Sequence, residues 1–92
     1  MKVALTELEQ VAKDLSIKVT YEDLRTSRGG SCRVMSTRRI IINKHLHNNE
    51  KITLLARELG RFDLSGLELG DRVKKKIEQE SDRQAEPLKL TA

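Results

Sequence analysis

The chain has 92 residues, of which 35% are charged and 37% hydrophobic, so it is expected to form a single globular domain. It contains no apolar run near the roughly 18 residues that cross a bilayer, and no signal-peptide core follows Met1. Because its one cysteine, Cys32, cannot form an internal disulfide, we expect a cytoplasmic protein without a membrane role.

Residues 6–15 are predicted to form an amphipathic helix. Thr6 and Glu9 have the spacing of a capping box, so Thr6 is expected to be the N-cap. The residues that recur at helical spacing are Leu8, Val11, Ala12 and Leu15.

The next segment predicts three strands. Apolar and polar residues alternate over 17–21, and Gly29-Gly30 predicts a break. Two β-rich runs, 31–35 and 39–43, predict a hairpin in which Cys32 faces the core. The triple isoleucine 40–42 is typical of a central strand that is covered on both faces.

A second helix is predicted over residues 48–62, followed by a connector and a third helix over 71–82. The core stripe of the second helix consists of Ile52, Leu55, Leu59 and Phe62. The third helix has a thin apolar stripe, Val73 and Ile77, and should dock weakly. We therefore expect one domain over 1–82 and a flexible tail over 83–92.

The element order α-β-β-β-α-α indicates an α+β fold. Its predicted form is a small three-stranded antiparallel sheet packed on helices.

The positive charge is concentrated in residues 25–49, which contain six basic residues and no acid. The rest of the chain has 12 basic and 14 acidic residues, a net charge of −2. A local basic field attracts acidic proteins or the phosphates of nucleic acids. The basic residues of this window are Arg25, Arg28, Arg33, Arg38, Arg39 and Lys44.

Residues 55–61 read Leu-Ala-Arg-Glu-Leu-Gly-Arg, which is the H-E-x-x-H zinc-hydrolase pattern with arginine at both histidine positions. A guanidinium has no lone pair to give a metal. At roughly 5 Å from a divalent ion, each arginine would repel it by about 6–7 kcal/mol. We therefore expect no metal, no cofactor and no catalytic residue here.

Residues 8–63 resemble the ImmA/IrrE-like family of small bacterial zinc metallopeptidases. The resemblance includes the first helix and strand, the hairpin ending in Ile40-Ile41-Ile42-Asn43, and the helix with the 55–61 motif. It implies a minimal zincin-like scaffold in which Glu58 matches the catalytic glutamate. Arg57 and Arg61 depart from the two histidine ligands, and no third ligand is identifiable.

Three functional hypotheses follow. In the leading one, the chain is a non-catalytic module that binds a protein or peptide, with Arg57, Glu58 and Arg61 in a cationic pocket that grips a carboxylate or phosphate. The same three residues are alternatively only a solvated helix face. The second hypothesis is a nucleic-acid-binding domain that uses residues 25–44. The third is a cryptic metal-dependent hydrolase that uses Glu58 or the pair His45 and His47.

Overall fold

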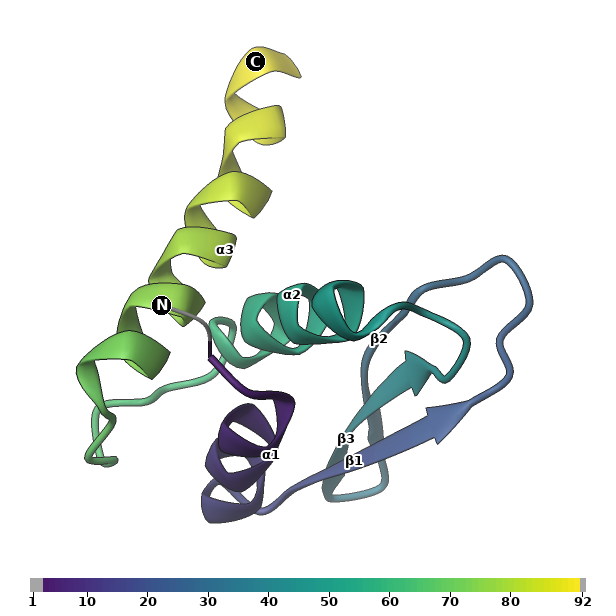
Figure 1. Cartoon of the computed structure of the whole chain (residues 1–92), viewed down its shortest axis with the longest axis horizontal. Coiled ribbons are helices and arrows are strands. Elements are labelled where there is room, and N and C mark those ends of the chain that lie inside the picture. Colours follow the sequence, from purple (N-terminus) through teal and green to yellow (C-terminus); the bar gives the residue numbers. More distant parts are fainter. Residues whose placement is uncertain (1–2, 92) are drawn as a thin grey trace.

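The computed structural model describes the backbone of residues 3–91 and the side chains of residues 3–33 and 35–81. Its elements follow the predicted order, which confirms the α+β class (Figure 1). They are α1 (Leu5–Asp14), β1 (Ile17–Glu22), β2 (Gly29–Val34), β3 (Thr37–Asn43), α2 (Asn48–Leu59) and α3 (Asp71–Thr91).

The N-cap of helix α1 lies two residues before the predicted one. Its N-cap is Ala4, whose N–H donates to the carboxylate of Glu7 at 3.0 Å. Glu7 therefore takes the part that was assigned to Glu9, and the predicted cap at Thr6 is wrong. Leu8, Val11 and Ala12 of the predicted core stripe are all buried.

The sheet has the strand order β1-β3-β2, so β3 is central as predicted. β2 and β3 form the predicted antiparallel hairpin, with Val34 paired to Thr37 across a two-residue turn. β1 pairs with β3 in parallel, from Ile17 opposite Arg38 to Glu22 opposite Asn43. The sheet is therefore mixed, and the predicted all-antiparallel arrangement is wrong.

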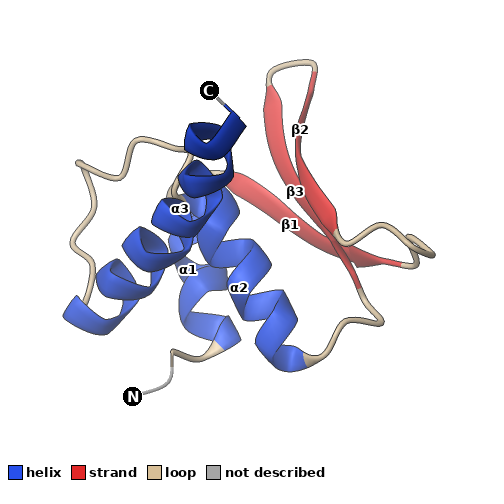
Figure 2. Cartoon of the chain, turned by 90° about the horizontal axis from the view of Figure 1, so that it is seen from above, coloured by secondary structure: helices blue, strands red, loops and turns tan. Residues whose placement is uncertain are grey.

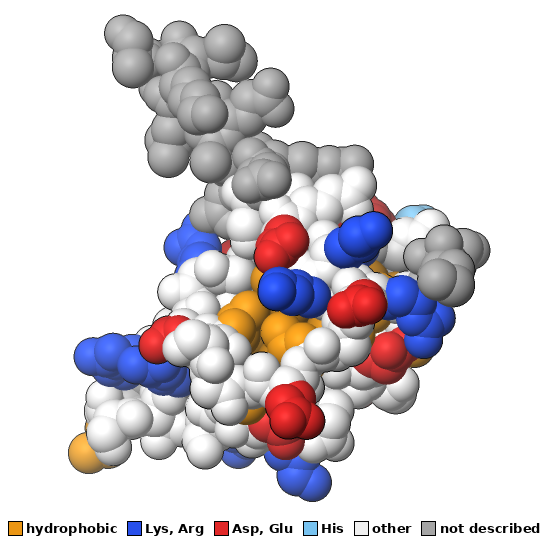
Figure 3. All heavy atoms as spheres, turned by 90° about the vertical axis from the view of Figure 1, so that its left-hand side faces the viewer, with side chains coloured by type: hydrophobic (Ala, Val, Ile, Leu, Met, Phe, Trp, Pro, Cys, Tyr) orange, Lys and Arg blue, Asp and Glu red, His pale blue; other side chains and the backbone are white. Residues whose placement is uncertain are grey.

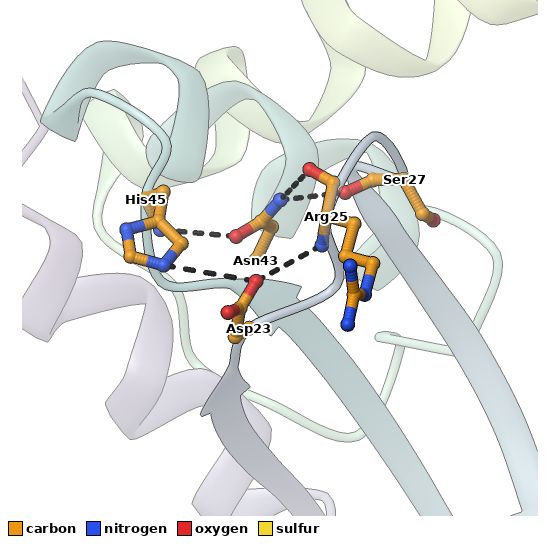
Figure 4. A network of polar contacts seen from close by, with 5 residues as sticks. All are labelled: Asp23, Arg25, Ser27, Asn43 and His45. Carbon is orange, nitrogen blue, oxygen red and sulfur yellow. Dashed lines mark hydrogen bonds and ion pairs between the residues drawn. The ribbon is translucent and has the colours of Figure 1, made fainter.

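The connector from β1 to β2 explains the mixed sheet. Residues 23–28 pass the end of β3, so β2 forms on its far side, about 10 Å or two strand spacings from β1. Asn43 fixes this crossing, because its side-chain amide donates to the carbonyl oxygens of Arg25 (3.0 Å) and Ser27 (2.8 Å). Its amide oxygen accepts the N–H of His45 at 3.0 Å (Figure 4).

The helices cover one face of the sheet (Figure 2). Ile40 and Ile42 face them and are fully buried, whereas Ile41 on the other face is only half-buried. The expectation that both faces of β3 are covered is therefore wrong. Cys32, which alternates with the helix-facing residues of β2, is exposed and does not face the core as predicted.

Helix α2 lies between the sheet and the other helices. Leu55 and Leu59 of its predicted stripe are fully buried, and its buried surface also includes Leu54 and Ala56. The helix ends at Leu59 rather than at residue 62. The next turn is tighter, because the N–H of Phe62 donates to the carbonyl of Leu59.

Helix α3 packs on α2 through its first half, where Val73, Ile77 and Glu80 are buried. It continues to Thr91, past the predicted end at Asp82, and its last turns extend away from the rest of the chain (Figure 1). The side chains of residues 82–91 lie outside the described part, so the flexible tail over 83–92 stays a prediction.

Candidate anion-binding site

Glu58, near the end of α2, lies between Arg57 and Arg61. Glu58 is only 4% exposed. Its Oε2 lies 3.9 Å from Nε of Arg57, and its Oε1 lies 3.5 Å from Nε of Arg61. The carboxylate is therefore buried, whereas the side chains of Arg57 and Arg61 are 36% and 53% exposed and reach solvent on the same helix face. Both arginines lie within ion-pair distance of this one carboxylate.

A groove of about 410 Å³ lies between the sheet and the end of α2. Its basic lining comes from three places in the chain: Arg33 on β2, Arg38 on β3 and Arg61 after α2. The guanidinium of Arg38 lies over the ring of Phe62, 5.3 Å from the ring centre. A cation–π contact of this kind attracts the guanidinium to the face of the ring. The other lining residues are Ser31, Cys32, Phe62 and Asp63.

Arg33 and Arg38 stand directly opposite each other in the hairpin. The N–H of Asn43 donates to the carbonyl of Arg28, so these two residues form a hydrogen-bonded pair of the antiparallel strands. Hydrogen-bonded and non-hydrogen-bonded pairs alternate along the strands, which makes Arg33 and Arg38 a non-hydrogen-bonded pair. Side chains are closest in such pairs, and two like charges there destabilise the sheet. Among the described side chains, neither arginine has an ion pair with an acid.

The acid nearest to them in the groove, Asp63, is engaged locally. Its Oδ1 accepts the N–H of Ser65 at 3.0 Å and the hydroxyl of Ser65 at 2.7 Å. These hydrogen bonds to Ser65 lower the pKa of Asp63 below its ordinary value. Asp63 therefore stays a carboxylate at neutral pH, with its charge turned toward its own turn.

The charges around the groove leave a local excess. The charged residues that line it are Arg33, Arg38, Arg61 and Asp63, three positive charges and one negative. Their net charge is +2. This excess is the electrostatic feature that a ligand would meet.

The remaining basic residues of the 25–44 window do not join this groove. Arg39 lies on the opposite sheet face, beside Lys18 and Cys32 in the register. The other three, Arg25, Arg28 and Lys44, lie at the far end of the hairpin, about 17 Å from Arg38 at 3.3 Å per residue. Arg28 there pairs with Glu50 at 3.6 Å. The structure therefore divides the predicted basic window into three separate parts.

The two histidines have local partners. Nε2 of His45 lies 3.7 Å from the Asp23 carboxylate, and His47 is the N-cap of α2, where its N–H donates to Glu50. Within the described side chains, no three His, Cys, Asp or Glu residues lie close enough to hold a metal ion.

A second concavity, of about 510 Å³, has a different character. It lies between the 63–70 connector and α3, and its apolar lining comprises Leu64, Leu67, Leu69 and Ile77. The face that Figure 3 shows carries acidic and basic side chains interspersed around an apolar centre. That face therefore has no field of one sign, unlike the arginine groove.

Sequence reasoning missed the role of Phe62. The residue was assigned to the core stripe, and it does pack against the core, but it also supports Arg38. No local pattern could have paired positions 38 and 62, because they meet only when the hairpin docks on the end of α2. The sequence likewise gave no sign that Arg33 and Arg38, unlike the other window arginines, would share a groove with Arg61.

The chain matches no protein-family model, no curated protein and no solved structure. In the part of the chain that the structure describes, no helix is both long and apolar enough to cross a membrane.

Proposed function

We propose that this protein is a non-catalytic interaction module that binds an acidic segment of a partner protein or peptide in the arginine groove. The observation that carries the proposal is the opposed pair of Arg33 and Arg38. Two like charges in adjacent strand positions destabilise the free protein, and an anionic ligand between them would remove that repulsion. Arg61 and the stacked Phe62 extend the same surface.

The edge of the sheet supports an extended segment as the ligand. β2 is an edge strand, and every second residue of it directs its backbone N–H and C=O away from β3. By the alternation given above, these residues are Gly29, Ser31 and Arg33. Ser31 and Arg33 also line the groove. A peptide that adds a strand there would gain main-chain hydrogen bonds while its acidic side chain enters the groove.

We further propose that the scaffold is a zincin-like one that has lost its metal chemistry. Arg57 and Arg61 occupy the two ligand positions of the motif, and the groove lies beside the second of them. An anion would then bind near the place where the metallopeptidases hold their metal. The exposed thiol of Cys32 suits a reducing compartment, so we place the activity in the cytoplasm.

A nucleic-acid-binding domain that uses residues 25–44 is the alternative. A phosphate backbone is bound by a continuous row of basic groups. The basic residues here occupy the groove, the opposite sheet face and the far end of the hairpin, and one of them already pairs with Glu50. The distribution therefore favours a compact acidic group over a long phosphate backbone.

Fluorescence anisotropy tests the proposal. The probes are two labelled random peptide pools of equal length, one rich in Glu and Asp and one with Gln and Asn in their place. We expect the wild type to bind the acidic pool, and Arg33→Gln with Arg38→Gln to weaken this at least about tenfold. Lys18→Gln with Arg39→Gln, which removes the same two charges from the opposite sheet face, is the matched control. Equal loss in the control, or tighter binding of a random DNA duplex, would contradict the proposal.

A further inference from the structure

We infer that the group bound in the arginine groove is a phosphorylated side chain of the partner, a phosphomonoester rather than a carboxylate. This inference rests on the proposed function, because it names the ligand of the same site. It would make the protein a reader of a phosphorylation state.

The groove carries an excess of two positive charges. Its charged lining residues are Arg33, Arg38, Arg61 and Asp63, three positive and one negative. One carboxylate carries −1 and would neutralise only half of this excess. A phosphorylated serine or threonine carries about −1.5 to −2 at pH 7, so one such group matches it.

The two arginines are close enough to bind one anion together. Directly opposed residues in a non-hydrogen-bonded pair have Cβ atoms about 4.5–5.5 Å apart, so Arg33 and Arg38 leave the sheet side by side. Two carboxylates brought to this pair would repel each other at similar distance. A phosphomonoester places both charges on one tetrahedral centre, and its three terminal oxygens can bridge two guanidinium groups.

Phe62 restricts Arg38 before the ligand arrives. The guanidinium lies over the ring, 5.3 Å from the ring centre, and this cation–π contact limits the positions of the group. A guanidinium can donate two parallel hydrogen bonds to oxygens of one anion. The groove volume of about 410 Å³ leaves room for the side chain that carries the phosphate.

The residues around the groove favour a peptide over a nucleic acid as the molecule that carries the phosphate. A nucleic-acid phosphodiester carries only one negative charge, and its affinity comes from a row of such contacts that this divided basic surface does not offer. A peptide can instead use the free backbone groups of Ser31 and Arg33 on the edge of β2, next to the groove. The observations therefore favour a phosphopeptide.

The test is an NMR titration of the full-length, ¹⁵N-labelled protein that follows the Nε–H signals of Arg33, Arg38 and Arg61. The probes are N-acetyl-phosphoserine-amide, N-acetyl-glutamate-amide, the dicarboxylate peptide acetyl-Glu-Ala-Glu-amide and a random DNA duplex. We expect phosphoserine to bind about tenfold more tightly than either carboxylate probe, with the largest shifts at Arg33 and Arg38.

A pH comparison provides a second readout. The second pKa of a phosphomonoester is about 6, so its charge approaches −2 between pH 5 and pH 7.5, whereas glutamate is ionised throughout. Affinity for phosphoserine should rise several-fold over this interval, while affinity for glutamate should not. Arg33→Gln and Arg38→Gln should each abolish the rise, and the matched control Arg39→Gln should retain it.

The outcomes separate the two proposals. Equal affinity for phosphoserine and glutamate, with shifts at Arg33 and Arg38, would overturn the phosphate inference and leave the proposed function standing. Absence of shifts with all three acidic probes, together with no binding of the acidic peptide pool, would overturn both. Tighter binding of the duplex would overturn both in favour of the nucleic-acid alternative.

Discussion

At the end of β3, the side chain of Asn43 satisfies three backbone groups: the carbonyl oxygens of Arg25 and Ser27 and the N–H of His45. Asn43 is 4% exposed, so water cannot readily replace these bonds. The connector it holds is the one that carries the chain past β3. A single polar residue thereby stabilises the strand order and, through it, the place of β2 at the sheet edge.

Replacing Asn43 should therefore cost more than an ordinary surface substitution. We expect Asn43→Ala to lower the free energy of unfolding by about 1–3 kcal/mol, because it leaves two carbonyl oxygens without their donor. Urea denaturation measures this change. Asn49→Ala, at an exposed position in the first turn of α2, is the control and should change stability by less than about 0.5 kcal/mol. Equal effects would show that the connector does not depend on Asn43.

At the scale of elements, α2 and α3 pack closely because the residue that follows α2, Gly60, has no side chain. Gly60 follows α2 with φ −65° and ψ −11°, a conformation that any residue adopts. A Cβ there would lie 1.8 Å from Oγ of Ser81 on α3. The glycine is therefore needed for space rather than for backbone freedom, and it lets α3 approach the end of α2 closely.

This predicts a specific coupling between the two positions. Gly60→Ala should destabilise the protein by about 1–3 kcal/mol through overpacking. Ser81→Ala alone should be nearly neutral, because its buried hydroxyl has no hydrogen-bond partner among the described residues. In the Ser81→Ala background the cost of Gly60→Ala should fall by more than half. A double-mutant cycle of urea unfolding free energies measures the coupling, and additive effects would contradict the close contact.

Across the whole molecule, the core is a single cluster that joins one face of the sheet to all three helices. It ends on α3 at Ile77, and the last buried residue described there is Glu80. The positive charge is not spread evenly over this body. Only the groove between the sheet and the end of α2 combines opposed arginines with an aromatic platform among the described residues. Charge placement, rather than net charge, is the property on which the proposed binding depends.

The position of the core predicts where the chain can be shortened. A version that ends after Asp82 should unfold cooperatively and retain its stability to within about 1 kcal/mol, because the apolar core of the described part is then intact. Thermal and urea denaturation of the two lengths make the comparison. A loss of cooperativity, or a much larger loss of stability, would show that residues 83–92 belong to the domain.

Much of the fold could be predicted from local patterns. The period-3.6 stripe of Leu55 and Leu59 gave the second helix, and the alternation of Ile17, Val19 and Tyr21 gave the first strand. The element order and the hairpin were confirmed for the same reason: each depends on neighbours in the chain. Helix ends were less accurate, as at Thr6 and Phe62, because caps and final turns depend on competing side chains.

The sequence by itself therefore determined which segments are helix or strand, the α+β class and the absence of histidine from both ligand positions of the 55–61 motif. Only the tertiary structure decided that β1 runs parallel to β3, that Glu58 is buried, and that Arg38 lies over the ring of Phe62. The spacing of apolar residues along the chain shows which side of a helix or strand is apolar. The partner of that side is fixed by long-range packing, since a connector only a few residues long can lead either to the adjacent strand or past it.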